Sequence, residues 1–216
     1  MSRALRFWAG FLLALAALMA VSAYSTVAFA DSLPQGAYAH QQLQRQQAQS
    51  VWGLNAPIST LAAQVHQESG WNCNAVSPVG ALGCTQFMPA TANDIARRYP
   101  ADLHPVNPRN PRWAYRAQAQ YMKSLYDGRG ARGAVNRCEQ MAFALSAYNG
   151  GEGWVIRDRA LADRQALPYG RFFGAAQRVN AGRAPAYKRE NAEYPQRILL
   201  QVEPRYVRAG FGAGSC

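Results

Sequence analysis

The sequence contains few of the side chains that bind transition metals in proteins. Its 216 residues include three histidines and four cysteines, and no two cysteines have the C-x-x-C spacing of a zinc site. The histidines are His40, His66 and His104, and none lies at ligand spacing beside a cysteine. The sequence therefore predicts no metal site.

The sequence also lacks internal repeats, an obvious interdomain linker and any long stretch in which apolar and polar residues alternate. Alternation of this kind is typical of half-buried β-strands. Its absence argues against a large sheet, and the chain is predicted to be mainly α-helical. Residues 31–216 are enough for one domain with a core of its own.

Acidic residues are scarce. The chain has 12 Asp and Glu against 23 Lys and Arg, a net charge of +11, and its only lysines are Lys123 and Lys188. A basic excess can attract a polyanion such as the cell wall, anionic lipid or nucleic acid. The arginines are scattered along the chain, and it has no recognisable nucleic-acid-binding motif. We therefore expect no specific nucleic-acid partner.

Residues 1–30 have the composition of a secretory signal peptide. Arg3 and Arg6 give a positive start, residues 7–23 are apolar or small, and A-F-A at 28–30 offers a cleavage site. The apolar stretch is close to the lower limit of the about 17–25 residues that span a bilayer, so an N-terminal membrane anchor is the alternative. The A-x-A site favours cleavage, and we expect an exported, periplasmic protein.

Two disulfides are expected from the four cysteines of an exported chain. Four cysteines allow three connectivities, and the sequence alone does not select one. We favour Cys73–Cys84, which would close a short loop, and Cys138–Cys216, which would tie the C-terminal residue to the body of the protein.

Helices are predicted where apolar residues recur at spacings of three and four. Residues 58–69 follow this pattern, and Gly70 is a natural stop, so that Glu68 lies in the last turn of a helix. Further helices are expected over 37–52, 89–99, 112–126, 138–148 and 186–208.

The residues after the expected cleavage site are predicted to be irregular. Pro34 and Gly36 oppose regular structure over residues 31–38. A polar helix follows them. We therefore divide the exported chain into an N-terminal polar helical segment, 31–56, and a main domain, 57–216.

Glu68 is the first candidate for chemistry. The helix dipole disfavours a negative charge at the C-terminal end of a helix, and burial against Trp71 or a bound ligand would disfavour it further. Both effects raise the pKa of the carboxyl group. A carboxyl group with a raised pKa can donate a proton to a leaving oxygen near neutral pH. An exposed helix glutamate without a role is the alternative for a single Glu, and the surrounding residues decide against it.

Three sequence blocks carry a family resemblance. Residues 67–92 contain E-S-x-aromatic-N, then S-P-x-G-A-x-G, then Q-x-M-P-x-T-A; residues 147–153 read A-Y-N-G-G-E-G, and residues 190–194 read E-N-A-E-Y. In this order the blocks closely resemble the signature of the soluble lytic transglycosylase family. The first two are the more specific, and together the blocks span about residues 57–200.

The resemblance implies a fold and a set of site residues. The fold would be a lysozyme-like single domain of the goose-type lysozyme and SLT kind, with a deep substrate cleft. Glu68 would be the catalytic acid and base. The residues implied to contact substrate are Ser77 and Gln86 as polar lining, Met88 as an apolar wall, Tyr148 and Asn149 on the opposite side with Tyr148 near the carboxyl group, and Tyr194 as an outer tyrosine of the cleft.

The sequence departs from the family pattern at several positions. Cys84-Thr85 stands where a Leu-Met pair is usual, which suggests that a disulfide holds one wall of the cleft. Asn191 replaces a threonine, and Pro195 replaces an aliphatic residue after Tyr194. Both changes in the third block lie close to Tyr194.

The implied mechanism follows from the number of carboxylates. Ordinary glycosidases use two, but the motif around Glu68 offers no partner, and Asp94 is expected only to cap or solvate the following helix. The resemblance implies that Glu68 protonates the glycosidic oxygen between N-acetylmuramic acid and N-acetylglucosamine and then accepts the proton of the C6 hydroxyl. That hydroxyl attacks C1 and forms a 1,6-anhydromuramyl end, with no cofactor.

Two other functions remain open at this point. A hydrolytic muramidase of the same fold would use water in place of the C6 hydroxyl. An inactive cell-wall-binding component of an envelope assembly machine would lack the reaction altogether. The expected partners are peptidoglycan glycan strands and a secretion, conjugation, pilus or phage machine that needs local opening of the wall, and we expect a monomer.

Overall fold

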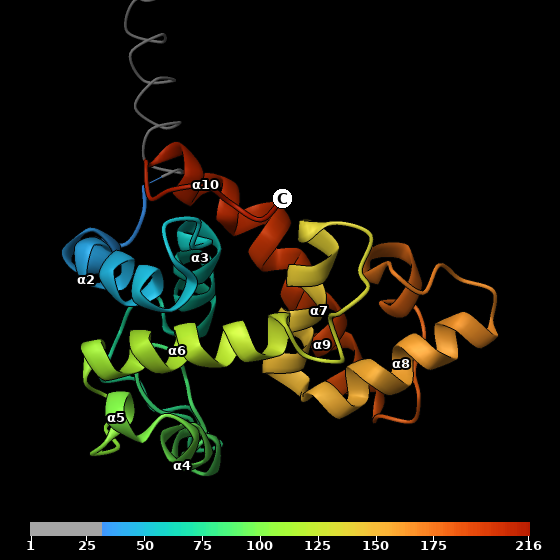
Figure 1. The fold of residues 1–216 in the computed structure, drawn as a ribbon, viewed down its shortest axis with the longest axis horizontal. Coiled ribbons are helices and arrows are strands. Elements are labelled where there is room, and N and C mark those ends of the chain that lie inside the picture. The colour runs from blue at the N-terminus through green and yellow to red at the C-terminus, as the bar shows by residue number, and fades with distance from the viewer. Residues whose placement is uncertain (1–31) are drawn as a thin grey trace, which may run out of the picture. The chain divides into compact units, whose positions relative to one another are not determined.

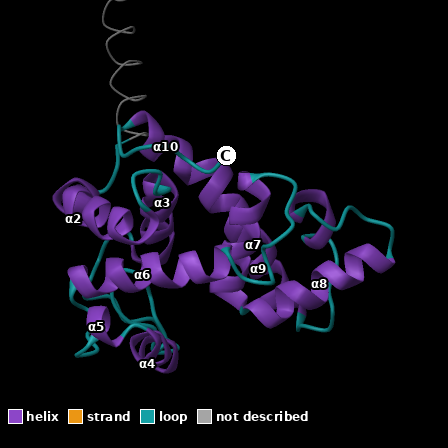
Figure 2. Cartoon of the chain, viewed as in Figure 1, coloured by secondary structure: helices purple, strands orange, loops and turns teal. Residues whose placement is uncertain are grey.

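The computed structural model describes residues 32–216, so the predicted signal peptide lies outside the described residues. These residues form α-helices joined by loops (Figures 1 and 2). The α-helices are α2 (Gln35–Trp52), α3 (Ile58–Ser69), α4 (Pro89–Arg98), α5 (Pro100–Leu103), α6 (Pro111–Tyr126), α7 (Arg137–Gly150), α8 (Glu152–Arg164), α9 (Pro185–Gln196) and α10 (Glu203–Arg208). The other two segments are a π-type turn, η2 (Arg197–Val202), and a kinked turn, η1 (Phe172–Ala176), in which Phe173 and Gly174 have non-helical backbone angles.

The mainly α-helical class predicted from the sequence is confirmed. Residues 32–216 contain no β-strand and only two isolated bridges, which pair Val76 with Leu82 and Leu82 with Phe87. Within the same residues, no helix is long and apolar enough to cross a membrane.

Helix α7 is the central helix of residues 34–216, which form one compact unit. It contacts α6, α8 and α9 (Figure 1). Its residues 141–147 are all buried, which is typical of a helix that is surrounded by other helices. The side chain of Asn136 starts it by accepting a hydrogen bond from the backbone N–H of Glu139 at 2.9 Å.

The expectation of irregular structure over residues 31–38 was wrong from Gln35 onward, where α2 begins. Pro34 directly precedes the helix, at a position where its missing N–H costs no helical hydrogen bond. Gly36 serves a close approach between segments: a Cβ atom at this position would lie 2.9 Å from Cβ of Trp71. Both residues therefore fit a helix start that packs tightly.

Several other boundaries differ from the expectation. The last residue of α7 is Gly150, whereas we expected the helix to end at Tyr148. The next residue, Gly151, has a φ of 93° and stops the helix. Helices α5 and α8 were not predicted. The helix expected over 186–208 is divided by η2 into α9 and α10, and Pro195 lies just before this turn. A proline inside a helix removes one backbone hydrogen bond. Prolines and π-type irregularities are both common causes of kinks in helices.

The structure contains the disulfides Cys73–Cys84 and Cys138–Cys216, the two pairs favoured from the sequence. Cys138 lies in the first turn of α7, so the second disulfide joins α7 to the C-terminal residue. The same end of the chain is held by Glu203, whose carboxylate accepts hydrogen bonds from the backbone N–H groups of Ser215 and Cys216 at 3.0 and 3.2 Å. Its other oxygen accepts from the hydroxyl of Thr60 in α3.

We predict that Gly36→Ala destabilises the protein by about 1–3 kcal/mol, because the added methyl group overpacks the contact with Trp71. The free energy of unfolding in urea measures the effect. Gln42→Ala, an exposed substitution in the same helix, is the control and should change stability by about 0.5 kcal/mol or less. Equal stability of the two variants would contradict the proposed role of Gly36.

Candidate active site

Glu68 lies in the last turn of α3, as predicted. Residues 58–65 of this helix are buried, so the helix is anchored over its first two turns. Gly70, in the left-handed conformation with a φ of 58°, ends the helix, and its N–H donates to the carbonyl of His66. The Glu68 carboxyl group is therefore presented by a fixed backbone at a helix end.

The carboxyl group faces a cleft of about 280 Å³. Five of the residues that the sequence analysis proposed for substrate contact line this cleft together with Glu68: Ser77, Gln86, Met88, Tyr148 and Asn149. Residues 77–88 come from the loop that follows α3, and Tyr148 and Asn149 come from the end of α7. The structure thus brings the two sequence blocks together in the lining of one cleft, and the contact of each residue with a substrate stays a prediction.

The loop of residues 70–88 is held by its own polar side chains. Ser77 accepts the backbone N–H of Ala81 at 2.9 Å, and Gln86 donates its amide to the carbonyl of Gly83 at 2.9 Å. Gly83 allows the loop to approach the residues before α6, since a Cβ atom there would lie 1.9 Å from the carbonyl oxygen of Pro108. Met88 stays 43% exposed at the rim of the cleft.

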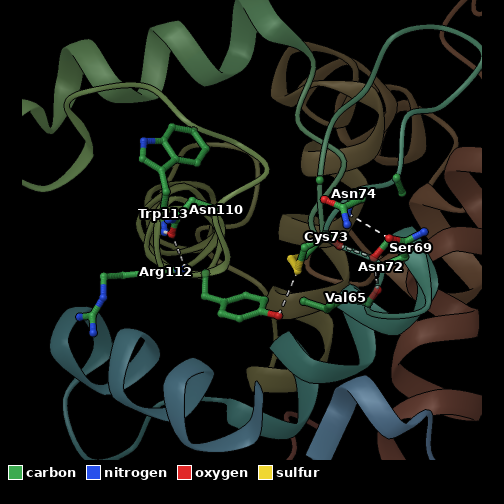
Figure 3. The surroundings of a disulfide bond; sticks show 12 residues. Val65, Ser69, Asn72, Cys73, Asn74, Asn110, Arg112 and Trp113 are labelled. Atoms are coloured by element: carbon green, nitrogen blue, oxygen red, sulfur yellow. Dashed lines mark hydrogen bonds between the residues drawn. A yellow bond between two sulfur atoms is a disulfide. The ribbon is translucent and has the colours of Figure 1, made fainter. Parts of the chain in front are cut away.

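The Cys73–Cys84 disulfide closes this loop on itself just after the end of α3, and a hydrogen bond ties it to the helix. The hydroxyl of Ser69 donates to the carbonyl of Cys84 at 2.7 Å, one residue from Glu68. Figure 3 shows Cys73 beside Ser69 and Asn72, at the end of the helix. The disulfide and the hydrogen bond therefore hold the loop wall against the helix that carries the carboxyl group.

From the sequence, Trp71 was one candidate for the side chain that buries Glu68, but in the structure it lies in the core and not in the cleft. Its side chain is 4% exposed, does not line the cleft, and donates through Nε1 to the hydroxyl of Tyr206 at 2.6 Å. Its ring packs with those of Tyr115 and Phe211. The left-handed backbone at Trp71, with a φ of 71°, turns the chain so that the indole enters the core.

Tyr194 was expected at the outer part of the cleft, and this was wrong. Its side chain is 3% exposed, and its hydroxyl donates a hydrogen bond to Oε1 of Glu68. The amide of Gln64, one helical turn before Glu68, donates to the same hydroxyl at 3.2 Å. Gln118 of α6 donates in turn to the side-chain oxygen of Gln64 at 2.9 Å. A sequence block gives the order of residues along a helix but not the depth of each side chain, which explains the error.

Tyr148 makes a different contact. Its hydroxyl donates to the backbone carbonyl of Thr85 at 2.7 Å and so joins α7 to the loop of residues 70–88. Because the acceptor is a backbone oxygen, this bond tolerates the replacement of the family's usual residue by Thr85. Burial and the nearby Glu68 raise the pKa of Tyr148 well above its ordinary value. The phenol therefore stays protonated and acts as a donor.

The environment of Glu68 raises the pKa of its carboxyl group to about 7. Burial is the largest cause, and the negative charge of Glu190 adds to it, whereas the hydrogen bond from Tyr194 acts in the opposite direction. Near neutral pH a large fraction of the molecules therefore carry a protonated Glu68. Such a group can donate a proton and later accept one.

Glu190 is a cleft residue that the sequence analysis missed. It lies on α9, lines the same cleft as Glu68, and accepts a long hydrogen bond of 3.4 Å from the amide of Asn149. The expectation that no second carboxylate lies near Glu68 was therefore wrong. The sequence feature that could have identified Glu190 as a cleft residue is its position at the start of the third sequence block.

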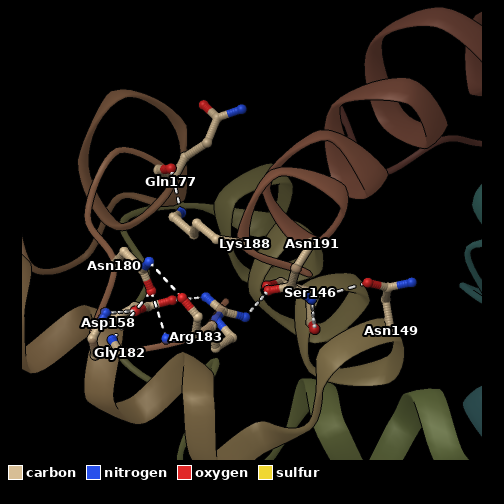
Figure 4. A network of polar contacts seen from close by, with 10 residues as sticks. Ser146, Asn149, Asp158, Gln177, Asn180, Gly182, Arg183, Lys188 and Asn191 are labelled. Carbon is tan, nitrogen blue, oxygen red and sulfur yellow. Dashed lines mark hydrogen bonds and ion pairs between the residues drawn. The ribbon is translucent and has the colours of Figure 1, made fainter. Parts of the chain in front are cut away.

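Helices α7 and α9 are joined by a buried polar network around Asn191, which is 2% exposed (Figure 4). Its amide donates to the carbonyl of Ser146 at 2.7 Å and to the side chain of Asn149 at 3.2 Å. Its oxygen accepts from the hydroxyl of Ser146 at 2.8 Å and from the guanidinium of Arg183. Asn191 lies one helical turn before Tyr194, so this network sets where α9 places the phenol.

The network extends to a buried ion pair. Arg183 pairs with Asp158 of α8, and both side chains are 6% exposed. Asp158 also accepts the backbone N–H of Ala181 at 2.9 Å, which orders the loop before α9. Gly150 fits beside the network, since a Cβ atom there would lie 2.3 Å from the Asn191 amide. The close packing of α7 and α9 thus depends on glycine as well as on the buried polar groups.

Comparison with known proteins identifies the family. Residues 46–167 match the family model of the transglycosylase SLT domain. The chain belongs to the transglycosylase SLT domain family. A solved structure of the 70 kDa soluble lytic transglycosylase of Escherichia coli is similar to this SLT domain, with a TM-score of 0.52 and 22% identity, over 85% of this chain and 30% of that one. The lysozyme-like fold expected from the sequence is thereby confirmed.

Curated relatives are similar to parts of this SLT domain. The membrane-bound lytic murein transglycosylase F of Shewanella pealeana is 33% identical over 107 residues, 50% of this chain and 20% of the relative. The protein of the same name from Thiobacillus denitrificans is 30% identical over 178 residues, 74% of this chain and 35% of the relative. The soluble lytic murein transglycosylase of Escherichia coli K12 is 31% identical over 105 residues, 48% of this chain and 15% of the relative. The chain thus spans only a minor part of each relative.

We predict opposite changes in the pKa of Glu68 when its two neighbours are altered. Tyr194→Phe removes a hydrogen bond that stabilises the carboxylate, so the pKa should rise above about 7. Glu190→Gln removes a negative charge, so the pKa should fall. Carbon-13 NMR titration of labelled glutamate carboxyl groups measures both, and the resonance of Glu68 is assigned by its loss in Glu68→Gln. Shifts in the same direction would contradict this account of the site.

We also predict that Asn191→Ala lowers the free energy of unfolding by about 2–4 kcal/mol, because it leaves a buried hydroxyl and a buried guanidinium short of a partner. Asn191→Thr, which introduces the residue usual in the family, should cost less, since its hydroxyl retains part of the network. Gln196→Ala, an exposed amide on the same helix, is the control for urea unfolding. A loss of stability in Asn191→Ala no larger than in this control would refute the role of the network.

Proposed function

We propose that this SLT domain is a peptidoglycan lytic transglycosylase that cleaves the β-1,4 bond between N-acetylmuramic acid and N-acetylglucosamine without consuming water. The observation that carries the proposal is the Glu68 carboxyl group: it faces the cleft, its pKa is about 7, and a buried phenol holds one of its oxygens. The relatives named lytic murein transglycosylases support the same reaction class.

The first step breaks the glycosidic bond. Protonated Glu68 transfers its proton to the bridging oxygen as the bond from C1 to that oxygen breaks, and the N-acetylglucosamine leaves with a free hydroxyl. The acetamido oxygen of the muramyl residue stabilises the positive charge that develops at C1, as in substrate-assisted glycosidases. Glu68 is then a carboxylate, and the hydrogen bond from Tyr194 stabilises this form.

The second step closes the new ring. The Glu68 carboxylate accepts the proton of the muramyl C6 hydroxyl, and the oxygen of that hydroxyl forms a bond to C1. The product carries a 1,6-anhydromuramyl end, Glu68 is protonated again, and no water is consumed. One group with a pKa near 7 suits both roles, because it donates and accepts protons with similar ease at neutral pH.

A hydrolytic muramidase is the second candidate, and Glu190 is the observation that favours it. A second carboxylate in the cleft could orient a water molecule, as in inverting glycosidases. Glu190 is exposed and bonded only weakly to Asn149. The single protonated carboxyl group held by Tyr194 fits the transglycosylase better, and the products distinguish the two reactions.

We place this activity in the periplasm, after export by residues 1–30, where it would open the wall locally for a secretion, conjugation, pilus or phage machine. The domain would act there as a monomer on peptidoglycan glycan strands. The two disulfides support an oxidising compartment.

The products released from purified peptidoglycan test the proposal, and mass spectrometry identifies them. The wild-type protein should release muropeptides with anhydromuramyl ends, and Glu68→Gln should reduce this release by at least about a hundredfold, the lower range for loss of a general acid. Glu193→Gln, an exposed glutamate on α9 that pairs with Arg197, is the control and should retain activity. Reducing ends that disappear in Glu190→Gln would establish the hydrolase instead, and no release by the wild type would refute both.

A further inference from the structure

Two buried glutamines lie behind the hydrogen bond between Tyr194 and Glu68. Gln64 lies in α3 and Gln118 in α6, and their side chains are 0% and 1% exposed. Neither lines the cleft, so neither is placed to touch a substrate. Burying an amide is unfavourable unless it is hydrogen-bonded. This amide pair, Gln64 and Gln118, is therefore expected to do something that apolar side chains of similar volume would not.

The amide pair belongs to a series of hydrogen bonds that ends at the carboxyl group. Nε2 of Gln118 donates to the backbone carbonyl of Leu61 at 3.0 Å and to Oε1 of Gln64 at 2.9 Å. Nε2 of Gln64 donates to the hydroxyl of Tyr194 at 3.2 Å, and that hydroxyl donates to Oε1 of Glu68. The series thus connects α6, α3 and α9.

The backbone carbonyl of Leu61 determines the direction of every bond in the series. A carbonyl oxygen can only accept a hydrogen bond, so Gln118 must turn its NH₂ group toward it. That NH₂ group also faces Gln64, which must present its oxygen there and its own NH₂ group to Tyr194. Because an NH₂ group of an amide donates and does not accept, the hydrogen of the Tyr194 hydroxyl is directed to Glu68.

Gln118 keeps this orientation although one of its own atoms lacks a partner. Among residues 32–216, no group donates a hydrogen bond to its buried Oε1. An unpaired buried acceptor lowers stability. Turning the amide by 180° would place this oxygen against the oxygens of Leu61 and Gln64, which is worse. Stability is thus given up at Gln118, and one direction of the series is fixed.

We propose that Gln64 and Gln118 are positioning residues of the reaction, which hold the hydroxyl hydrogen of Tyr194 on Oε1 of Glu68. This inference rests on the proposed function. If the amide of Gln64 were free to turn, its oxygen would compete with Glu68 for that hydrogen. With the direction fixed, Oε1 accepts from the phenol, and the proton of the acid form is carried by Oε2. The bond from Gln64 also makes the phenol a stronger donor, because linked hydrogen bonds strengthen one another.

The pKa of Glu68 tests the role of Gln64. The titratable groups that face Glu68 are Tyr194 and Glu190 of α9 and Tyr148 of α7, and Gln64→Met alters none of them. The change removes the donor and keeps a side chain of similar length. The carboxylate then receives a weaker hydrogen bond, so the pKa of Glu68 should rise above about 7, by less than in Tyr194→Phe. Carbon-13 NMR titration of labelled glutamate carboxyl groups measures the change.

A double variant separates this effect from a loss of packing. In the Tyr194→Phe background no hydroxyl is left to orient, so adding Gln64→Met should not change the pKa of Glu68 further. Gln47→Met is the matched control, because Gln47 is also buried, at 4% exposed, and accepts a hydrogen bond from Arg116 at 2.9 Å. This control should lower stability and leave the pKa of Glu68 unchanged.

Gln118→Met is a second test, which decides the matter if Gln64→Met does not fold. It removes two hydrogen bonds but also the unpaired oxygen, so the fold is expected to persist, and unfolding curves check this. Gln64 is then free to turn, and the pKa of Glu68 should again rise.

The pH profile of anhydromuramyl release gives a second readout for both variants. Glu68 becomes a weaker acid, so activity at the optimum should fall about two- to fivefold. Because the acid form persists to higher pH, the decline of activity at alkaline pH should move to higher pH. A loss of packing alone would lower activity without moving this decline.

The outcomes separate the positioning role from the reaction. An unchanged pKa of Glu68 in both Gln64→Met and Gln118→Met would overturn the proposal. An equal rise from Gln64→Met with and without the Tyr194 hydroxyl would also overturn it and assign the amide pair to packing. If the wild type yields no anhydromuramyl ends but the pKa values follow the expected pattern, the proposed reaction fails, and the positioning of Glu68 by the amide pair stands.

Discussion

The hydrogen bond between Tyr194 and Glu68 joins residues that are 126 positions apart in the chain. Glu68 is fixed by the short helix α3, and Tyr194 reaches it from α9, close to the other end of the protein. The bond holds one oxygen of the carboxyl group of Glu68, which lines the cleft. It also opposes the rise in pKa that burial causes. The position and the acidity of the central group therefore depend on how well α9 is placed.

The placement of α9 depends on groups that are far from the chemistry. Asn191 bonds to Ser146 and Asn149 of α7, and the Asp158–Arg183 ion pair extends the same network to α8. Buried polar groups of this kind are costly unless every member finds a partner, so they favour one packing of the helices over others. The sequence departs from its family at Asn191, and here the amide makes four hydrogen bonds where a threonine would make fewer.

Much of the fold is encoded in local sequence features. Helix α3 could be predicted because its apolar spacing and Gly70 define both ends, and the loop wall because its motif is rich in turn-forming residues. Helix α8 was missed, since its charged residues Asp158 and Arg159 are buried and obscure the apolar pattern. The irregular start assigned to residues 31–38 shows the same limit: Gly36 reads as a helix breaker, and only the neighbouring Trp71 explains it.

The residues of the site could be identified from the sequence, but how deeply each side chain is buried could not. Glu68, Ser77, Gln86, Met88, Tyr148 and Asn149 line one cleft, in agreement with the motifs that grouped them. The depth of Tyr194 and the entry of Glu190 into the cleft depend on the rotation of α9 about its axis. That rotation follows from tertiary packing around Asn191, which no local pattern encodes.

The two disulfides divide the site into covalent rings. Ser77 lies within the ring closed by Cys73–Cys84, and Tyr148, Asn149, Glu190 and Tyr194 lie within the ring closed by Cys138–Cys216. All four cysteines are used in these two bonds, so no disulfide joins one wall to the other. Across the cleft, the walls meet through non-covalent contacts that include the hydrogen bonds of two tyrosines, to Thr85 and to Glu68. Each wall is thus stiffened from within, while the separation between the walls depends on non-covalent contacts alone.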